Sequence, residues 1–347
     1  MGFARLLPRS SRAQHSVVED EELEVVMSEI RPEYPADLPT HDEVPAFDEL
    51  PSLEELPVAV EPEPAPAVPV AAAPVVSAPI VVPQAPSPGL TGTRIIALAN
   101  QKGGVAKTTT TLNLGVAFKE MGYRVLLIDL DPQGNLTMSQ GLNPDTIETS
   151  MFDVLVRKIP ISDVIERREV DLAVASIDLA GAELALAALI GRERSLEKAL
   201  VEVRDRYDFI LIDTPPSLGL LTINAFVAAT GVIVPVQCEY LALRGLVQLE
   251  NTLAMVRENL NPRVGVEGIV PTMYDSRTLH AREAVEILEE NFGDLVYNTR
   301  IRKTVRFAEA PVKGLSVLAY EPSGDAARMY RDLAQEVLSG QKSRQHA

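Results

Sequence analysis

Lys102 and Lys107 lie on either side of a glycine pair in the segment NQKGGVAKTTTT, residues 100–111. An apolar run that leads into a glycine turn and then into Lys-Thr is the arrangement of a phosphate-binding loop. Backbone N–H groups of the turn and of the helix N-terminus point at the phosphates, and the helix dipole favours negative charge there. Lys107 would then reach the β- and γ-phosphates, and the Thr108 hydroxyl would bind Mg²⁺. The segment therefore predicts a site for a nucleoside triphosphate.

Carboxylates stand at the ends of two other apolar runs. RVLLIDLD ends in Asp129 and Asp131, and YDFILID ends in Asp213. Phosphoryl transfer to water needs neutralised charge at the γ-phosphate and an oriented nucleophile. A scaffold without enzymatic activity would have no need of these carboxylates together with Lys107 and Thr108, so the set predicts hydrolysis.

The elements that must position these residues begin at Thr93, where apolar runs alternate with amphipathic stretches. Near-continuous apolar strands separated by helices predict an α/β fold with a mainly parallel, twisted sheet flanked by helices. Ligands of such sheets bind beyond the carboxyl ends of the strands, and each polar motif named above lies at such an end. We expect strands at 94–100, 124–131, 170–176, 207–213, 231–237 and 265–273, and helices at 108–122, 179–190, 194–205, 218–229, 242–259 and 278–291.

The helix expected at 108–122 directly follows the phosphate-binding loop. Leu112, Val116 and Phe118 are expected to pack inward from it, and Gly122 to end it. Its first turn would then face the phosphates while its apolar side packs on the sheet.

The N-terminal part of the chain has a different composition. The 347 residues carry a net charge of −17, and most of the excess acid and of the 26 prolines lies in residues 1–92. This predicts a disordered acidic arm at 1–92, one ATPase domain at 93–340 and a disordered tail at 341–347. The acidic run VEDEELEVVMSEI, residues 18–30, could also form a short helix when it is bound to a partner.

Targeting and redox signals are weak in this sequence. The stretch APAVPVAAAPVVSAPIVVP, residues 65–83, is apolar enough for a membrane span, but its repeated prolines would break a helix, so we expect an extended linker. The start, MGFARLLPRSSRAQ, has no apolar core of signal-peptide length. The single cysteine, Cys238, excludes a disulfide framework within the chain and fits a reducing compartment.

The string KGGVAKTT resembles the deviant Walker A motif, K-G-G-x-x-K-[ST], of the ParA/MinD ATPases. The resemblance covers residues 93–340 and is strongest to the chromosomal, Soj-like ParA partition ATPases. It implies a role for the additional lysine, Lys102. In that family the first lysine of the motif acts in trans within an ATP-sandwiched dimer. The resemblance also implies that Asp131 positions the attacking water, that Asp129 lies beside the metal and phosphates, and that Asp213 lies near Mg²⁺.

Further segments, such as PTMYDSRTLH and RFAEAP, are similar to Soj and place Met273 at a strand end and Pro311 in a loop near the adenine. The catalytic residues implied are Lys102, Lys107 and Asp131. The implied nucleotide contacts are Lys102, Gly103, Gly104, Val105, Ala106, Lys107, Thr108, Thr109, Asp129, Met273 and Pro311.

Two segments depart from the family pattern. The residue before the second lysine is usually glycine, and here it is Ala106, which is disfavoured if the position needs a positive φ. The segment usually written I-P-R-N-V-R is IRKTVR here, residues 301–306, with Arg302 in place of proline and Lys303 in place of arginine. ATP binding is expected to survive the first change, and the second adds positive charge.

A surface for DNA must depend on local charge, because the total charge opposes it. NTRIRKTVR and the nearby Lys313 bring several cations together, and Arg277 and Arg306 match two arginines that bind DNA without sequence preference in Soj-like dimers. With Lys303 they form the predicted DNA surface. The alternative is an ordinary solvated basic face. No helix-turn-helix or aromatic platform is evident, so base-specific recognition is not expected.

Other classes of protein share this phosphate-binding loop. A MinD-like membrane ATPase would end in a basic amphipathic helix, whereas the tail DLAQEVLSGQKSRQHA has only a short apolar face. An iron–sulfur reductase would need more cysteines than Cys238 to bridge a dimer. The alternative left open is an orphan ParA-like ATPase that positions a different cargo.

We therefore expect a weak ATPase that uses ATP/ADP and Mg²⁺, forms a homodimer with ATP and binds non-specific DNA. A ParB-like centromere-binding protein would stimulate it in chromosome or plasmid partitioning. The protein is expected in the cytoplasm, associated with the nucleoid and not with membrane, and a polar or scaffold partner could bind the arm.

Overall fold

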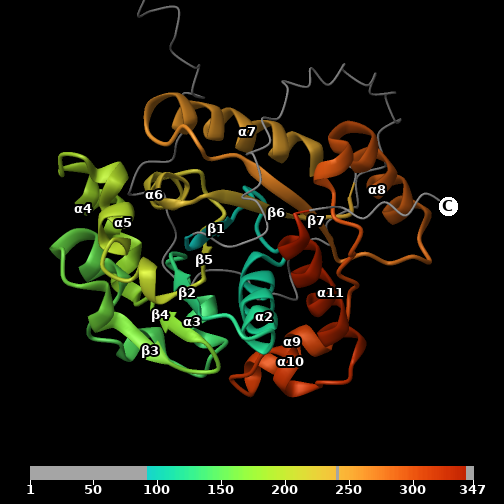
Figure 1. The fold of residues 1–347 in the computed structure, drawn as a ribbon, viewed down its shortest axis with the longest axis horizontal. Coiled ribbons are helices and arrows are strands. Elements are labelled where there is room, and N and C mark those ends of the chain that lie inside the picture. The colour runs from blue at the N-terminus through green and yellow to red at the C-terminus, as the bar shows by residue number, and fades with distance from the viewer. Residues whose placement is uncertain (1–91, 240–241, 341–347) are drawn as a thin grey trace, which may run out of the picture. The chain divides into compact units, whose positions relative to one another are not determined.

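The computed structural model describes residues 92–239 and 242–340, and this part of the chain is built on one sheet (Figure 1). The strand order is β3-β4-β2-β5-β1-β6-β7. Neighbouring strands run parallel except β3 and β4, which are antiparallel. The sheet is therefore mainly parallel, as predicted. Its strands are β1 (Arg94–Leu98), β2 (Val125–Asp129), β3 (Ile165–Arg167), β4 (Asp171–Ala173), β5 (Phe209–Asp213), β6 (Gly231–Gln237) and β7 (Val266–Thr272).

Helices cover both faces of the sheet, which explains why the strands are apolar along their whole length. On one face Ile95 and Ile128 share a core with residues of α4 to α7, and on the other Ile96 and Leu127 share a core with α2 and α11. Figure 1 shows α7 on one side of the sheet and α2 with α11 on the other. The helices are α2 (Lys107–Glu120), α3 (Asn135–Met138), α4 (Ala182–Ala187), α5 (Ser195–Leu200), α6 (Leu220–Ala228), α7 (Ala242–Asn259), α8 (Leu279–Phe292), α9 (Arg306–Val312), α10 (Val317–Tyr320) and α11 (Asp325–Ser339).

Helix α2 has the inward face that the sequence predicted. Leu112, Val116 and Phe118 are buried, and Gly122 follows the end of the helix with a φ of +91°. The helices expected at 179–190 and 194–205 are shorter than predicted, because 3₁₀ turns occupy part of each range. The expectations for residues 18–30, 65–83 and 341–347 lie outside the described residues.

The C-terminal helix α11 contains the start of the tail DLAQEVLSGQKSRQHA, and the described part of that tail buries only Leu333, Ala334 and Val337. Together with Ala326, Ala327 and Tyr330, these residues form the face of α11 that packs on α2. Tyr330 is fully buried there, with its hydroxyl 3.3 Å from the hydroxyl of Thr110. This face is therefore part of the core and is not free to enter a lipid surface. Within the described residues, no helix is long and apolar enough to cross a membrane.

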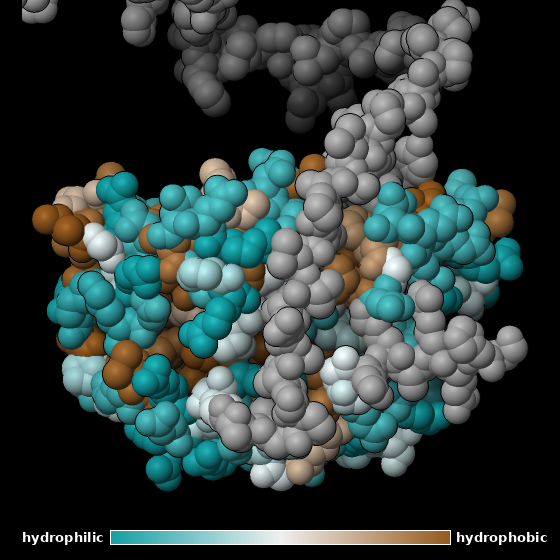
Figure 2. All heavy atoms as spheres, turned by 45° about the horizontal axis from the view of Figure 1, so that its top comes forward, coloured by the Kyte–Doolittle hydropathy of each residue, from teal (hydrophilic) through white to brown (hydrophobic). Residues whose placement is uncertain are grey.

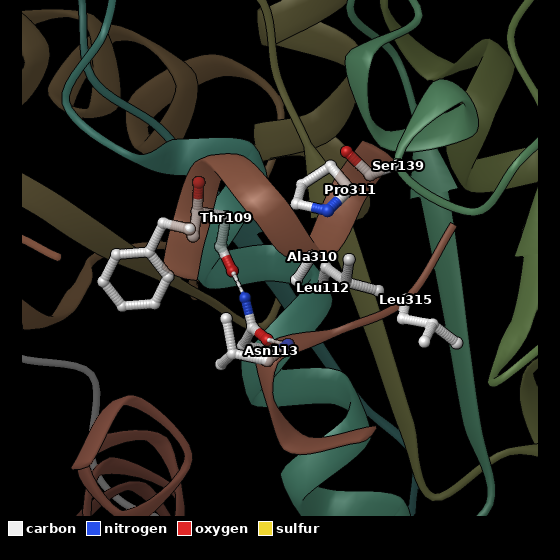
Figure 3. A pocket seen from close by; sticks show the side chains of 9 residues that line it. Thr109, Leu112, Asn113, Ser139, Ala310, Pro311 and Leu315 are labelled. Carbon is white, nitrogen blue, oxygen red and sulfur yellow. Dashed lines mark hydrogen bonds between the residues drawn. The ribbon is translucent and has the colours of Figure 1, made fainter. Parts of the chain in front are cut away.

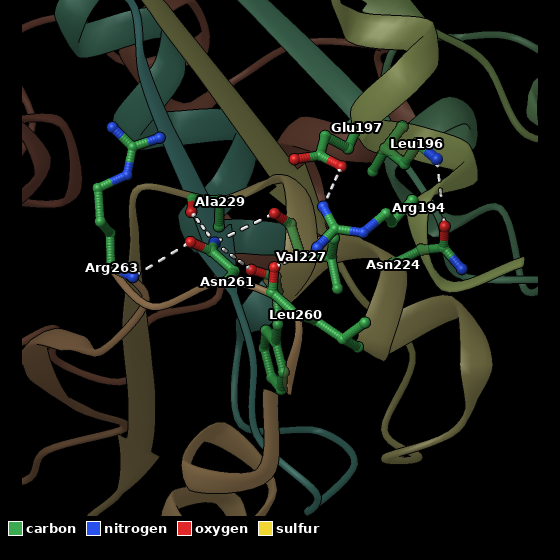
Figure 4. Close-up of polar contacts among 10 residues, drawn as sticks. Arg194, Leu196, Glu197, Asn224, Val227, Ala229, Leu260, Asn261 and Arg263 are labelled. Atoms are coloured by element: carbon green, nitrogen blue, oxygen red, sulfur yellow. Dashed lines mark hydrogen bonds and ion pairs between the residues drawn. The ribbon is translucent and has the colours of Figure 1, made fainter. Parts of the chain in front are cut away.

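Asn261, just after α7, holds the end of α6 (Figure 4). Its side-chain amide donates to the carbonyl oxygens of Phe226, Val227 and Ala229 at 3.0, 3.1 and 2.8 Å. Carbonyls at a helix C-terminus have no partner inside the helix, so this one side chain satisfies them. The anchoring matters for the site, because α6 follows the strand that ends at Asp213.

Candidate nucleotide site

The loop between β1 and α2 is tied to two strands on one side. Asn100 fixes its start: the side-chain amide donates to the Pro235 carbonyl at 2.8 Å, and Oδ1 accepts from the Lys102 backbone N–H at 2.9 Å. Further along the loop, the Thr272 hydroxyl donates to the Val105 carbonyl at 3.1 Å. The loop is thus held against β6 and β7 at the carboxyl edge of the sheet.

Two residues of the loop have left-handed backbone. Gly104 has a φ of +72°, and Ala106, at the start of α2, has a φ of +68° and a ψ of +32°. A Cβ makes this conformation unfavourable by about 1–2 kcal/mol. Ala106 therefore has a positive φ, the conformation in which the sequence analysis expected alanine to be disfavoured.

Lys107 is folded back over the loop. Its buried ammonium donates to the carbonyls of Asn100 (3.1 Å) and Lys102 (3.3 Å). Burial lowers the pKa of Lys107, and the negative charges of Asp213 and Asp131 oppose that shift. The cation is thus held beside the backbone N–H groups of the loop, where phosphate would lie.

Lys102 points away from this arrangement. Its ammonium is 2.6 Å from Oε2 of Glu239, which follows β6, and both side chains are about half exposed. For Lys102 to reach a nucleotide in a second subunit, this ion pair would have to open. An exposed pair of this kind contributes about 1 kcal/mol or less, so the energetic barrier to that exchange is low.

The carboxylates Asp129 and Asp213 are side by side at the ends of β2 and β5. Both are fully buried. Burial raises the pKa of Asp213 to about 8, and the neighbouring Asp129 adds to the shift. Burial also raises the pKa of Asp129 to about 6. Neighbouring buried carboxylates resist simultaneous ionisation unless a cation compensates their charge.

Asp213 has one oxygen available for such a cation. The Thr111 hydroxyl donates to its Oδ1 at 3.2 Å, whereas Oδ2 is buried without a hydrogen-bond partner among the described residues. The Thr108 hydroxyl lowers the pKa of Asp213 and so faces the same carboxylate. An orphaned carboxylate oxygen beside a hydroxyl fits Mg²⁺, which binds one or two protein oxygens together with substrate phosphates and water.

Asp131 lies just beyond β2 and is mostly buried. Its Oδ1 accepts from the Gln133 N–H at 3.0 Å, which fixes the side chain. Burial raises the pKa of Asp131, while that hydrogen bond and the charge of Lys107 lower it. The carboxylate is therefore fixed in the field of the loop lysine.

The structure adds two residues that no motif identified. Thr137, in α3, donates from its backbone N–H and its hydroxyl to Oδ2 of Asp129 at 2.9 and 2.7 Å. Glu183, in α4, accepts at Oε1 from the N–H of Leu221 at 3.2 Å and so holds the first turn of α6. A Cβ on Gly219 would lie 2.2 Å from the Glu183 carboxylate, so a side chain there would displace this contact.

The residues expected near the base come from elements other than the phosphate loop. Met273 directly follows β7, as expected, with a φ of +51°. Pro311 is in the last turn of α9 and not in a loop, which corrects the sequence interpretation. A small pocket between α2 and α9 contains Pro311 and Thr109 (Figure 3). Its lining is Thr109, Leu112, Asn113, Ser139, Phe307, Ala310, Pro311, Leu315 and Val317.

Asn113 organises this pocket. Its amide donates to the Thr109 carbonyl at 2.7 Å, and its Oδ1 accepts from the Val317 N–H at 2.8 Å. The first bond is drawn in Figure 3. A single side chain thus connects α2 to the start of α10, which keeps the α9–α10 region against the helix that follows the phosphate loop.

The predicted DNA residues differ in their partners. Arg277 is largely exposed, and its guanidinium binds Asp275 through Nε at 2.9 Å and Nη2 at 2.8 Å. Arg306 is half-exposed and pairs with Glu309 at 2.7 Å. These carboxylates pre-orient the two arginines and also compete with phosphate for them.

A second carboxylate, Glu321, lies 3.1 Å from Arg306. Lys303, in contrast, is exposed and has no carboxylate partner within the described ranges. Its backbone N–H donates to the Tyr274 carbonyl at 3.4 Å, which puts it beside the segment that carries Arg277. Lys303 and Arg277 therefore share one edge of the domain.

This chain is similar to several known proteins. The AAA domain family model matches residues 93–266. The sporulation initiation inhibitor protein Soj of Bacillus subtilis is 47% identical over 249 residues, which cover 71% of this chain and 98% of Soj. The chromosome partitioning protein ParA of Caulobacter vibrioides is 44% identical over 257 residues, covering 73% and 96% of the two chains.

Among solved structures, the cobyrinic acid a,c-diamide synthase of Mycobacterium smegmatis with bound ADP and magnesium is 42% identical, with a TM-score of 0.64. The similarity covers 72% of this chain and 97% of that one. The same protein with a bound ATP analog and magnesium is 41% identical, also with a TM-score of 0.64.

Proposed function

Because this chain belongs to the ParA/MinD family of ATPases, in its Soj-like branch, we propose that it is a nucleotide-dependent partition switch. In this proposal ATP joins two copies, the dimer binds DNA without sequence preference, and a ParB-like centromere-binding protein stimulates hydrolysis. ATP is the substrate, and Mg²⁺ is the metal ion. The Mycobacterium smegmatis structures hold ADP or an ATP analog with magnesium.

The observation that supports hydrolysis best is the buried Oδ2 of Asp213, which has no hydrogen-bond partner among the described residues and belongs to the carboxylate that Thr108 faces. These two residues would hold Mg²⁺, which when bound supplies Lewis-acid neutralisation of phosphate charge. Lys107 would neutralise the β- and γ-phosphates. Asp131, fixed by the Gln133 N–H, would orient the attacking water.

The proposed dimer gives Lys102 its role. Lys107 already supplies the cation within the subunit, so a second lysine on the same phosphates would be repelled. Lys102 is half-exposed and held by Glu239 through a weak surface ion pair. Exchange of Glu239 for the phosphates of a facing subunit would join the two copies and complete the charge neutralisation that hydrolysis needs.

Non-specific DNA binding that depends on the dimer also follows from charge. One copy presents few cations at the edge formed by Arg277, Lys303 and Arg306, and the two arginines are partly satisfied by carboxylates. Phosphate contacts add roughly independently to affinity, so doubling them strengthens binding strongly. A monomer would therefore bind DNA weakly and an ATP dimer tightly.

The two lysines provide the test. Lys107→Ala should abolish ATP binding, since it removes the cation within the subunit. Lys102→Ala should keep ATP binding while losing both ATP-dependent dimerisation and hydrolysis. ATP binding by fluorescence titration and mass by light scattering separate the two. Equal loss of ATP binding in both variants would place Lys102 in its own subunit's site and contradict the sandwich.

The Mycobacterium smegmatis protein carries the name of a diamide synthase, which is a different activity. The partition proposal predicts phosphate release with Mg²⁺ and ATP alone, raised by DNA together with a ParB-like protein. An absolute requirement for a carboxylic acid substrate and an amide donor would instead favour the synthase.

A further inference from the structure

The edge that carries Arg277 also carries a mixed basic and apolar surface, which we call the basic–apolar patch. It consists of Arg277, Leu279, Arg282, Arg302, Lys303 and Val305. These residues come from two segments that lie side by side, because Tyr274 forms a parallel bridge with Arg302 and accepts from the Lys303 N–H. On the right of Figure 2, where Figure 1 shows α8, the surface is mainly hydrophilic with hydrophobic atoms at its edge.

The cations of the patch are largely unneutralised. Arg282, Arg302 and Lys303 are exposed, and none has a carboxylate partner within 92–239 or 242–340. The carboxylate of Asp275 is taken up by Arg277. The patch therefore offers positive charge that an anionic partner could use.

Its apolar members favour a partner that has apolar groups of its own over a phosphate backbone alone. Leu279 is 58% exposed and Val305 is 67% exposed, each between cationic residues. Phosphates and sugars gain little from such side chains, whereas a peptide with acidic and apolar residues would bury them. The patch thus fits an acidic peptide with interspersed aliphatic side chains.

This chain contains such a peptide in residues 18–30, VEDEELEVVMSEI. Acidic residues and aliphatic ones alternate closely in it, and it has no lysine or arginine. The segment lies outside the described residues and outside the family match, which begins at residue 93. We propose that residues 18–30 dock on the basic–apolar patch of the same chain and exclude DNA from it.

The length of the chain permits this contact. About sixty residues separate the segment from β1, and a chain of that length can span up to ~200 Å. An attached peptide has an effective concentration in the millimolar range when its tether reaches the site. Even weak docking would then lower the apparent DNA affinity by roughly three- to tenfold at low salt. The proposal rests on the proposed DNA binding. The cross-linking measurement of docking does not depend on DNA.

The first measurement uses no DNA. In the full chain, a carbodiimide joins neighbouring carboxylates to lysines, and mass spectrometry identifies the pairs. The proposal expects Lys303 to be joined to residues 18–30. Links from Lys303 to other acidic segments only, or to none, would overturn docking whatever the protein does with DNA.

The second measurement is fluorescence anisotropy on a random duplex with ATP at low salt. One full-chain variant replaces Glu19, Asp20, Glu21, Glu22 and Glu24 by their amides. A matched control makes the same charge change at Glu49, Glu54, Glu55, Glu61 and Glu63. Docking predicts ~3–10-fold tighter DNA binding for the first and less than a twofold change for the control. Equal effects would mean general charge repulsion and would overturn the proposal.

A third variant separates docking from electrostatics. Leu279→Ser with Val305→Ser leaves every charge in place but weakens the peptide contact, so it should also bind DNA more tightly than the native chain. Unchanged affinity would contradict docking on this patch. Absence of DNA binding in all variants, with the Lys303 cross-link present, would refute the proposed DNA function and leave docking supported.

Discussion

At the scale of single residues, Ala106 is under backbone strain next to Lys107. Ala106→Gly should relieve the left-handed conformation, at φ +68°, and raise the free energy of unfolding by about 0.5–1 kcal/mol after the greater freedom of unfolded glycine is subtracted. Urea unfolding without nucleotide measures it. The matched control is Ala254→Gly inside α7, where glycine should instead cost about 1 kcal/mol. The same sign at both positions would exclude strain at Ala106.

The buried carboxylates predict a pH dependence for the protein without nucleotide or Mg²⁺. The pKa of Asp213 is 3.8 when unperturbed and about 8 in the fold, so the folded state binds an extra proton between those values. Stability contributed by this group is complete below pH 4 and is lost as the pH rises to about 8. Melting temperature should fall over that range, and Asp213→Asn should flatten the curve. Parallel curves for the two proteins would contradict the assignment.

The sequence predicted which site residues stand at strand ends, but not what holds them. Asp129 and Asp213 could be placed because each closes an apolar run, and parallel strands end at one edge. Thr137 and Glu183 could not, since each reaches its partner from another element. Such contacts depend on how elements pack, which no local spacing records.

At the scale of elements, α4 and α6 are coupled through Glu183. The N–H of Leu221, in the first turn of α6, has no acceptor within the helix. Among the described residues, the Glu183 carboxylate accepts its hydrogen bond. Glu183→Ala should destabilise the first turn of α6 by about 1–2 kcal/mol. Hydrogen exchange at residues 220–223 should therefore accelerate about 5–30-fold.

The matched control is Glu193→Ala, which removes a half-exposed glutamate paired with Arg192 on the neighbouring segment. It should leave exchange at residues 220–223 unchanged. Similar exchange in the two variants would show that Glu183 does not hold α6, and the coupling of α4 to the strand end at Asp213 would be lost.

The elements missing from the sequence prediction differ in how visible they were. β3 has three residues, too few to show alternation, and it joins the sheet antiparallel at its edge. α9 is short and contains Pro311. α11, in contrast, was readable, because its buried residues recur at helical spacing: Ala326, Ala327, Tyr330, Leu333, Ala334 and Val337. Helix α2 is buried on most of its sides, and its position directly after the phosphate-binding loop is what placed it.

At the scale of the whole domain, the polar motifs gather at the carboxyl edge of the sheet. The segment after β4 belongs to the same edge, because β4 runs parallel to β2. It leads into α4, where Leu184 is 84% exposed, and on to Ile190, which is fully exposed. Figure 2 shows hydrophobic atoms at the left margin, on the side where Figure 1 shows α4. An ATP-joined dimer that buries this edge would cover them.

This arrangement predicts which face the second copy uses. Leu184→Asp should abolish ATP-dependent dimerisation while ATP binding stays within twofold, because the charge would be buried at the interface without touching the phosphate loop. Met255→Asp is the matched control: Met255 is exposed near the end of α7, which leads to the amino end of β7, whereas α4 follows the carboxyl end of β4. Light scattering with ATP should show a monomer for the first variant and a dimer for the second. Dimers in both cases would mean that α4 lies outside the interface, and loss of the dimer with Met255→Asp alone would move the interface to α7.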